Sequence, residues 1–358
     1  MNGYHMIEEI HGQAAALTTI LEDVRPKIRE VARDVWNSKR PETFYLIGCG
    51  SSYYAAMLAS FYKEYRFGLD SHALPSSEFV WFAPRLKAPS PILIALSRSG
   101  MTSETVEATR KAKKAGVLAI AITADPDSTM GRECDDSVGL GISSEQSMIM
   151  TKTFTGSALC SVLLGLEFAK LRGNTIPEQV ENELIALPDY AKQTVDSVES
   201  QVRSIAETSG RATRFIYLGS GANYPVCLEG ALKLRETSYS ASEAYHAMEF
   251  RHGPFSELEA GIQVFGIVPR SRTTPQEVRL LKEVASTGAK VVPISNVPDL
   301  LSSHSESIRM PDTVYSDFAA FSYMIPMQML AYYHAVKKAL NPDRPRNLAR
   351  YVATEIAP

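Results

Sequence analysis

The segment FYLIGCGSSYY at residues 44–54 decides the fold, because the chain repeats its pattern as FIYLGSGANYP at residues 215–225. Each copy is an apolar run typical of a buried strand, followed by a glycine turn. Two further segments recur: PILIALSRSG from Pro91 as IQVFGIVPRS from Ile262, and AGVLAIAIT from Ala115 as TGAKVVPIS from Thr287. The three offsets are 171, 171 and 172 residues. Strand-like segments repeated at a nearly constant offset predict a duplicated domain.

Short apolar runs alternate with longer helical patterns in each copy. After PILIALS comes SETVEATRKAKKAG, in which Glu104 stands early, the lysines stand late and Gly116 follows the end, as is typical of a helix. Apolar strands that alternate with helices indicate a parallel sheet covered on both faces. We therefore predict an α/β fold of two tandem domains, each a mainly parallel sheet flanked by helices in a flavodoxin-like sandwich.

The domain boundaries follow from the same patterns. Residues 1–38 have apolar side chains at helical spacing and are predicted to form a helical lead-in. The first α/β domain is predicted at residues 39–173 and the second at residues 206–340. A helical linker is expected between them at residues 174–205, and a C-terminal tail at residues 341–358.

The composition excludes several classes of protein. The 358 residues are 45% hydrophobic and 22% charged, which is typical of a globular protein. A formal net charge of −3 without a basic run argues against nucleic acid as a partner. No secretion signal or apolar stretch of membrane length is evident, so no membrane partner is expected. The longest apolar stretch, from Ala158, contains Glu167 and favours a buried helix.

The cysteines indicate neither a metal site nor a disulfide framework. Four of them lie far apart in the chain: Cys49, Cys134, Cys160 and Cys227. This spacing favours free thiols in a reducing compartment, and therefore a cytoplasmic protein.

A hydroxyl-rich loop follows the predicted strand at residues 91–96. In a parallel α/β sheet, ligands bind beyond the carboxyl ends of the strands. The loop SRSGMT at residues 97–102 supplies the hydroxyls of Ser97, Ser99 and Thr102, and the next helix begins directly after it. Hydroxyls beside free N–H groups at a helix N-terminus form an anion site, and phosphate is the favoured anion. The alternative is simple capping of the helix by Thr102 or Ser103.

Two neighbouring residues add to this hypothesis. Arg98 places a cation in the loop, and Gly100 allows the backbone to approach a ligand closely.

Nucleotide and metal sites are weaker interpretations. The segment GCGSSY begins like a dinucleotide-binding fingerprint, but Tyr53 stands where its third glycine belongs, and Asp70 matches the ribose-binding acid only by its spacing. His246, Glu249 and His252 are spaced by three residues, but a Gly-Pro pair interrupts them and no fourth metal ligand is evident. We therefore expect neither a cofactor nor a metal.

The titratable residues gather in the second copy. Glu229, Lys233 and Glu236 share one face of a predicted helix, and His252 stands at a rigid Gly-Pro corner. This row is compatible with a solvated, salt-bridged helix face and a packing histidine. It is also compatible with a carboxylate base and a histidine acid.

With these residues in view, the chain is similar to the SIS (sugar isomerase) domain family. It resembles in particular the isomerase half of glucosamine-6-phosphate synthase and the SIS-type glucosamine-6-phosphate deaminases. The resemblance covers nearly the whole chain. It rests on GCGSSY, LSRSGMTSET, SMIMTKTFT, the long LEGALKLRETSYSASEAYHAMEFRHGP and NPDRPRNLAR. The fourth of these motifs is highly specific.

The resemblance implies that the first domain binds a hexose 6-phosphate or an amino sugar 6-phosphate. It assigns phosphate contacts to Ser97, Ser99 and Thr102, with Arg98 in place of the usual glutamine. It also implies that Ser52 contacts the sugar or its phosphate. The loop at residues 147–152, which begins at Ser147, would close the pocket, and the C-terminal tail would lie over it.

The resemblance also implies acid–base roles in the second domain. Glu236 corresponds to the base that moves a proton between C1 and C2 of the open-chain sugar, and Lys233 lies one turn before it. His252 corresponds to the histidine that opens the sugar ring and reaches the site from the partner subunit. We therefore expect a homodimer whose active sites are shared between subunits.

Two features depart from the synthase. The chain begins with Met1-Asn2 instead of a glutaminase domain with its cysteine nucleophile, so release of ammonia from glutamine is not expected. Arg350 stands where the synthase has a lysine that forms a Schiff base, and a guanidinium stays protonated and is no amine nucleophile.

The favoured reaction is aldose–ketose isomerisation with loss of the amine, from glucosamine 6-phosphate to fructose 6-phosphate and ammonia. The alternative is a deglycase that splits a fructosamine 6-phosphate into glucose 6-phosphate and an amino acid, which Arg350 favours. An alternative of another class is a non-catalytic sugar-phosphate-binding regulator.

Overall fold

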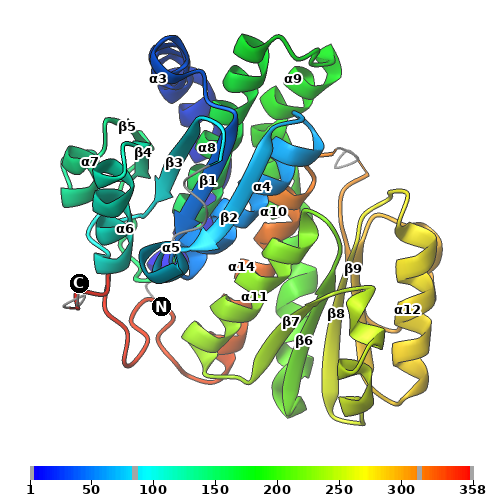
Figure 1. Cartoon of the computed structure of the whole chain (residues 1–358). Helices are drawn as coiled ribbons and strands as arrows, with labels where there is room; N and C mark the ends of the chain where they lie inside the picture. The colour runs from blue at the N-terminus through cyan, green and yellow to red at the C-terminus, as the bar shows by residue number, and fades with distance from the viewer. Residues whose placement is uncertain (1–3, 83–87, 313–316, 355–358) are drawn as a thin grey trace. The chain divides into compact units, whose positions relative to one another are not determined.

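The computed structural model describes residues 4–82, 88–312 and 317–354. The chain forms two compact units, and each contains one parallel sheet (Figure 1). The sheet-A unit comprises residues 15–145, 152–182 and 347–358. The sheet-B unit comprises residues 1–14, 146–151 and 183–346.

Sheet A has five parallel strands in the order β2-β1-β3-β4-β5. They are β1 (Thr43–Gly48), β2 (Asp70–Pro75), β3 (Pro91–Leu96), β4 (Leu118–Thr123) and β5 (Asp136–Gly139). The helices that pack on it are α3 (Arg25–Lys39), α4 (Ser51–Tyr65), α5 (Ser76–Phe82), α6 (Ser103–Lys114), α7 (Thr129–Glu133) and α8 (Lys152–Arg172). A π-helical turn, Ile20–Val24, leads into α3.

Helices cover both faces of sheet A. Its central strands are therefore apolar at consecutive positions, which point to opposite faces. Tyr45 and Ile47 of β1 pack in a core with α5, α6 and α7. The alternate residue Phe44 points to the other face, where its ring contacts Phe168 of α8 with centroids 5.2 Å apart. An apolar run in β1 is therefore what a strand between two helical layers requires.

Sheet B has the same arrangement of parallel strands, in the order β10-β9-β8-β6-β7. They are β6 (Arg214–Gly219), β7 (Ser242–His246), β8 (Ile262–Val268), β9 (Lys290–Ser295) and β10 (Ile308–Arg309). Helices α10 (Leu187–Thr208), α11 (Asn223–Ser238) and α14 (Ala320–Lys337) pack together, and α12 (Thr274–Ser286) and α13 (Pro298–Ser302) follow β8 and β9. The remaining helices are α1 (His5–His11), α2 (Gln13–Thr19), α9 (Glu178–Ile185) and three short 3₁₀ turns, Ser209–Arg211, Glu249–Arg251 and Pro254–Glu257.

The duplication extends to the backbone of the glycine turns. Gly50 and Gly221, which are 171 positions apart, have φ angles of 54° and 56° in the left-handed region that favours glycine. Gly48 and Gly219 end β1 and β6, and a Cβ on either would lie within 3 Å of the following helix's backbone. The predicted α/β fold with two tandem parallel-sheet domains is confirmed.

Helix α8 contains the apolar stretch that begins at Ala158. It is the one helix in the described ranges that is long and apolar enough to pass as a membrane span, but 83% of its apolar window is buried inside the fold. The stretch forms a core helix beneath sheet A, as expected from the sequence.

One side chain in this core is unusual. Lys63 of α4 is completely buried, and its Nζ donates hydrogen bonds to the main-chain oxygen and, at 3.1 Å, to the Oγ of Ser161 on α8. Gly165 makes room for it, because a Cβ there would lie 2.6 Å from the Lys63 Cγ. Burial lowers the pKa of Lys63 from its ordinary 10.5 to about 7.

Candidate active site

The candidate phosphate site lies where the strand order of sheet A reverses. Strands β1 and β3 are neighbours, but β2 pairs on the far side of β1, so the connections leave in opposite directions. Ligands of open α/β sheets bind at the carboxyl ends of two such strands. The turn at Gly50 follows β1 and the loop at residues 97–102 follows β3, so both lie at this edge.

The hydroxyl-rich loop folds around its own serines. Ser97 Oγ accepts a hydrogen bond from the amide of Gly100 at 3.1 Å and lies 3.4 Å from Thr102 Oγ1. Ser99 Oγ accepts from the amide of Met101 at 3.2 Å. Within the described ranges, the amides of Ser99 and Thr102 have no hydrogen-bond acceptor. Hydroxyls and free N–H groups at the start of a helix favour an anion.

Helix α6 is not capped by the side chain of its N-cap residue. Thr102 is the N-cap, and its hydroxyl makes no capping hydrogen bond. The hydroxyl of Ser103 accepts from the amide of Thr354, at 3.0 Å, in the C-terminal tail. Simple capping by either residue, the alternative to an anion site, is therefore not what the structure contains.

The structure leaves no room for a side chain at Gly100. Its φ angle is +61°, and a Cβ on it would lie 1.8 Å from the Oγ of Ser128. The backbone at Gly100 thus lies close to Ser128, the N-cap of α7.

Arg98 is held by a buried acid. Its Nη1 lies 3.2 Å from Oε2 of Glu145, and the two side chains are 12% and 0% exposed. Its Nη2 also reaches the main-chain oxygen of Arg350 at 3.5 Å. The guanidinium of Arg350 in turn donates to the main-chain oxygen of Glu145. The structure therefore brings Arg98 and Arg350 together through Glu145, a residue that the sequence analysis did not identify.

The two remaining predicted binding residues lie in different units. Ser52 is buried in the first turn of α4, at the carboxyl edge of sheet A. Ser147 belongs to the segment 146–151 of the sheet-B unit. Ser147 is fully buried, and its Oγ accepts from the amide of Ile149 at 3.2 Å. That hydroxyl therefore stabilises a turn within its own loop.

The predicted acid–base row lies on α11 of the sheet-B unit. Lys233 Nζ is 2.6 Å from Glu236 Oε2 and 3.2 Å from Glu229 Oε1. The Lys233 and Glu229 side chains are 1% and 0% exposed, whereas Glu236 is 19% exposed. A solvated, salt-bridged helix face is therefore the wrong interpretation of this row. Glu236 is the most exposed side chain of the row, although its Oε2 is buried.

The charges on this row hold Lys233 as an ammonium ion. Burial lowers its pKa, but the attraction of Glu229 and Glu236 outweighs burial and raises the pKa above the ordinary 10.5. The Lys233 ammonium therefore lies between two acidic side chains, 2.6 Å from Glu236 Oε2 and 3.2 Å from Glu229 Oε1. A partly exposed glutamate side chain is suited to act as a general base.

His252 lies exposed after the short 3₁₀ turn Glu249–Arg251. Gly253 follows with a φ angle of +129°, which fixes a sharp corner. The imidazole makes no hydrogen bond within the described ranges, and no contact with Glu236 is found there. The ring is therefore accessible to a ligand or to another chain.

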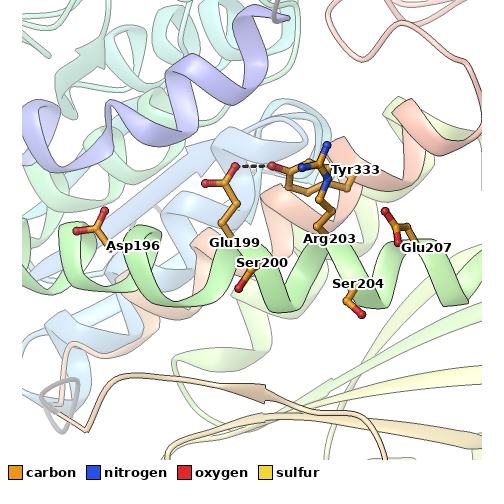
Figure 2. Close-up of a pocket in the computed structure, with 7 residues that line it drawn as sticks. All are labelled: Asp196, Glu199, Ser200, Arg203, Ser204, Glu207 and Tyr333. Carbon is orange, nitrogen blue, oxygen red and sulfur yellow. Dashed lines mark hydrogen bonds between the residues drawn. The ribbon is translucent and has the colours of Figure 1, made fainter.

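A shallow pocket of about 460 Å³ lies elsewhere in the sheet-B unit (Figure 2). It is lined by Asp196, Glu199, Ser200, Arg203, Ser204 and Glu207 of α10 and by Tyr333 of α14. Glu199 accepts from the Tyr333 hydroxyl, and Arg203 lies 5.5 Å above the Tyr333 ring. Its lining is largely exposed and includes none of the predicted site residues, so the pocket is a surface depression.

The described residues show no cluster suited to a metal. Among them, no three histidine, cysteine, aspartate or glutamate side chains converge on one point. The candidate site therefore consists of hydroxyls, amides and charged side chains.

Comparison with known protein families shows which family the chain belongs to. The model of the SIS domain matches residues 39–164 and again residues 211–338. The chain belongs to the SIS domain family. The two SIS domains correspond to the two parallel sheets, since β1 to β5 lie in the first match and β6 to β10 in the second.

Several relatives carry the name glutamine–fructose-6-phosphate aminotransferase (isomerizing). The one from Gloeobacter violaceus is 31% identical over 364 residues, which cover 98% of this chain and 59% of the relative. The one from Pyrobaculum aerophilum is 32% identical over 355 residues, which cover 98% and 58%. The chain thus spans about 59% of the length of these curated relatives.

Solved structures share the two-SIS fold. The C-terminal domain of glucosamine-fructose-6-phosphate aminotransferase from Francisella tularensis superposes with a TM-score of 0.85 at 24% identity, covering 96% of this chain and 98% of that one. A glucosamine-6-phosphate deaminase from Thermotoga maritima superposes with a TM-score of 0.79 at 27% identity, covering 97% and 99%.

Proposed function

We propose that this SIS protein is a phosphosugar isomerase that removes the amine from an amino sugar 6-phosphate, with glucosamine 6-phosphate as the leading substrate. The observation that carries the proposal is the buried row on α11, in which Lys233 lies 2.6 Å from the partly exposed side chain of Glu236. The relationship to a Thermotoga maritima glucosamine-6-phosphate deaminase supports the choice of substrate.

The 6-phosphate is proposed to bind at the carboxyl edge of sheet A. Hydroxyls of Ser97, Ser99 and Thr102 and the free amides of the loop supply its hydrogen bonds, with the positive end of the α6 dipole behind them. Ser52, from the neighbouring turn, is proposed to contact the sugar.

The chemistry is proposed to use residues of the second SIS domain. His252 donates the proton that opens the sugar ring. Glu236 then takes the proton from C2 and returns it to C1, which converts the aldose amine into a ketose imine. Water adds to the imine carbon, and its hydrolysis gives fructose 6-phosphate and ammonia. One water is consumed for each amine released, and no electron is gained or lost.

Neither Lys233 nor Arg350 is suited to form a covalent imine with the sugar. Lys233 is buried and its raised pKa keeps it protonated. Arg350 donates to a main-chain oxygen and remains a cation. Acid–base transfer by Glu236 and His252 is therefore the proposed route.

A second candidate is a fructosamine-6-phosphate deglycase. It needs the same proton transfer in the opposite direction, from C1 to C2, followed by hydrolysis of the imine at C1. Arg350 at the tail favours it, because this reaction needs no lysine there.

A release assay tests the function directly. The protein is incubated with glucosamine 6-phosphate, with other amino sugar 6-phosphates and with fructosamine 6-phosphates, and free amine and the ketose or aldose 6-phosphate are measured. We expect ammonia and fructose 6-phosphate in equal amounts from glucosamine 6-phosphate. Amino-acid release from fructosamines alone would identify the deglycase. Binding of sugar phosphates without any turnover would favour the regulator and overturn the enzyme.

Ser99→Ala should weaken the binding of the sugar phosphate by about ten-fold or more, because a hydrogen bond to a charged group contributes roughly 1.5–3 kcal/mol. Titration calorimetry with the 6-phosphate and with the plain sugar measures the effect. Ser302→Ala, an exposed serine on α13, is the matched control and should leave affinity unchanged. Equal affinity of wild type for the phosphorylated and the plain sugar contradicts the assignment of the loop.

A further inference from the structure

We infer that Glu145 and Arg98 form a positioning pair that fastens the C-terminal tail across the start of α6. The effect of this pair on catalysis rests on the proposed function, because the loop of Arg98 is the proposed phosphate site. Arg98 therefore holds the tail in place, in addition to supplying a positive charge in the loop. Arg98, Glu145 and the tail contacts of this pair all lie in the sheet-A unit.

The carboxylate of Glu145 is fixed at the start of α8. Its Oε1 accepts from the amide of Thr153 at 3.1 Å, and its Oε2 accepts from the Thr153 hydroxyl. Thr153 is the second residue of α8, so Glu145 stabilises the N-terminus of a 21-residue helix. The anchor of the pair is therefore part of the rigid core of the unit.

The pair depends on both of its charges. The side chain of Glu145 is 0% exposed, and Arg98 Nη1 lies 3.2 Å from it. A buried ion that loses its partner is strongly destabilising, because its charge is left uncompensated away from water. A neutral residue at position 98 would thus disturb Glu145, and a neutral residue at 145 would release Arg98.

The tail meets the pair and then continues to α6. Arg98 Nη2 donates to the main-chain oxygen of Arg350, whose own guanidinium donates to the main-chain oxygen of Glu145. Two residues further on, the oxygen of Val352 accepts from the amide of Ser103 at 3.2 Å. The amide of Thr354 donates to Ser103 Oγ at 3.0 Å. The described part of the tail, up to Thr354, accordingly lies beside α6 (Figure 1).

These contacts place the tail along one side of the proposed phosphate loop. The first contact is with Arg98 and the last is with Ser103, the residues that flank the hydroxyls of Ser99 and Thr102. A fastened tail shields the bound phosphate from solvent, which strengthens its hydrogen bonds. Loosening the tail is expected to raise the KM for the sugar phosphate more than it lowers kcat.

Hydrogen exchange of the ligand-free protein tests the pair without any assay of activity. Arg98→Gln and Glu145→Gln should each make the amides of Ser103 and Thr354 exchange roughly five-fold faster, as loss of a hydrogen bond of typical strength does. The double variant should exchange no faster than either single variant, because both remove the same interaction. Glu133→Gln, which breaks an exposed ion pair with Arg110 in the same unit, is the control and should leave these amides unchanged.

The outcomes separate this inference from the proposed function. Unchanged exchange of both amides in Arg98→Gln and Glu145→Gln overturns the pair even if the wild type is active. If Glu145→Gln fails to fold, Arg98→Gln decides alone, because Glu145 then still has the amide and hydroxyl of Thr153 as hydrogen-bond donors. Faster exchange in a protein that turns over no sugar phosphate supports the pair and refutes the enzyme. In an active protein, the KM of Arg98→Gln should rise several-fold, and Arg98→Lys should restore most of it.

Discussion

Glu236→Gln should lower the turnover of the sugar phosphate by about 10²–10⁴-fold, the usual contribution of a general base. Glutamine has nearly the same shape and keeps a hydrogen-bond acceptor for Lys233, but it cannot take a proton from carbon. The affinity for the sugar phosphate should change little, since the proposed phosphate contacts lie in the other SIS domain. Steady-state kinetics of amine release and calorimetric binding measure the two effects separately. Glu64→Gln, an exposed position on α4, is the control.

The variant Glu236→Gln isolates the proton-accepting role of this residue, because the rest of the buried row stays intact. Lys233 keeps Glu229 as a partner at 3.2 Å in the variant, so its charge stays compensated. A variant that folds and binds as the wild type does, yet turns over substrate at an undiminished rate, contradicts the role of Glu236.

The same variant tests where His252 acts. His252 is exposed and makes no contact with Glu236 in the described part of the chain, and we propose that it serves the active site of a partner copy. His252→Ala and Glu236→Gln should each be nearly inactive, and a mixture whose subunits exchange should regain part of the activity. Mixed dimers that form but stay inactive refute the shared site.

The fold was predictable from the sequence because strand periodicity leaves a strong signal. In β1, and in β6 after its first residue Arg214, every residue is buried and apolar or small, as burial on both faces demands, and the repeat at 171 residues shows the same pattern twice. The position of the loop at residues 97–102 was predictable for a related reason, since a loop directly after a buried parallel strand lies at the ligand edge of the sheet.

Contacts between polar side chains that are far apart in the sequence leave no comparable pattern in the sequence. Glu145 stands in an ordinary polar segment, and its partner Arg98 is 47 positions away. Lys63 looks like one of several polar residues near the end of α4, and its partner Ser161 is 98 positions away. The spacing of residues in the sequence shows which face of a helix a residue lies on. How deeply that face is buried depends on the elements that pack against it. Burial of the α11 row was uncertain for the same reason.

Lys63 should make the stability of the protein strongly dependent on pH. Its pKa is about 7 in the folded chain and 10.5 is the ordinary value of an exposed lysine, so the unfolded state binds more protons between these values. The free energy of unfolding should therefore rise with pH from about 7 to about 10 and level off beyond that. Below the folded pKa the side chain is charged in both states, and the full cost of burying the ammonium opposes folding.

Lys63→Met should remove this cost, because methionine fills a similar volume without a charge. At pH 6 the variant should be more stable than the wild type by on the order of 2–4 kcal/mol, the free energy that corresponds to the lowered pKa less the lost hydrogen bonds to Ser161. At pH 10 the advantage should nearly vanish, since the wild-type amine is then neutral in the folded state. Urea unfolding at a series of pH values measures both proteins, with the exposed Lys114→Met as the control. A difference in stability between Lys63→Met and wild type that is the same at every pH would show that the buried amine does not titrate in this range, and that its hydrogen bonds to Ser161 hold it charged.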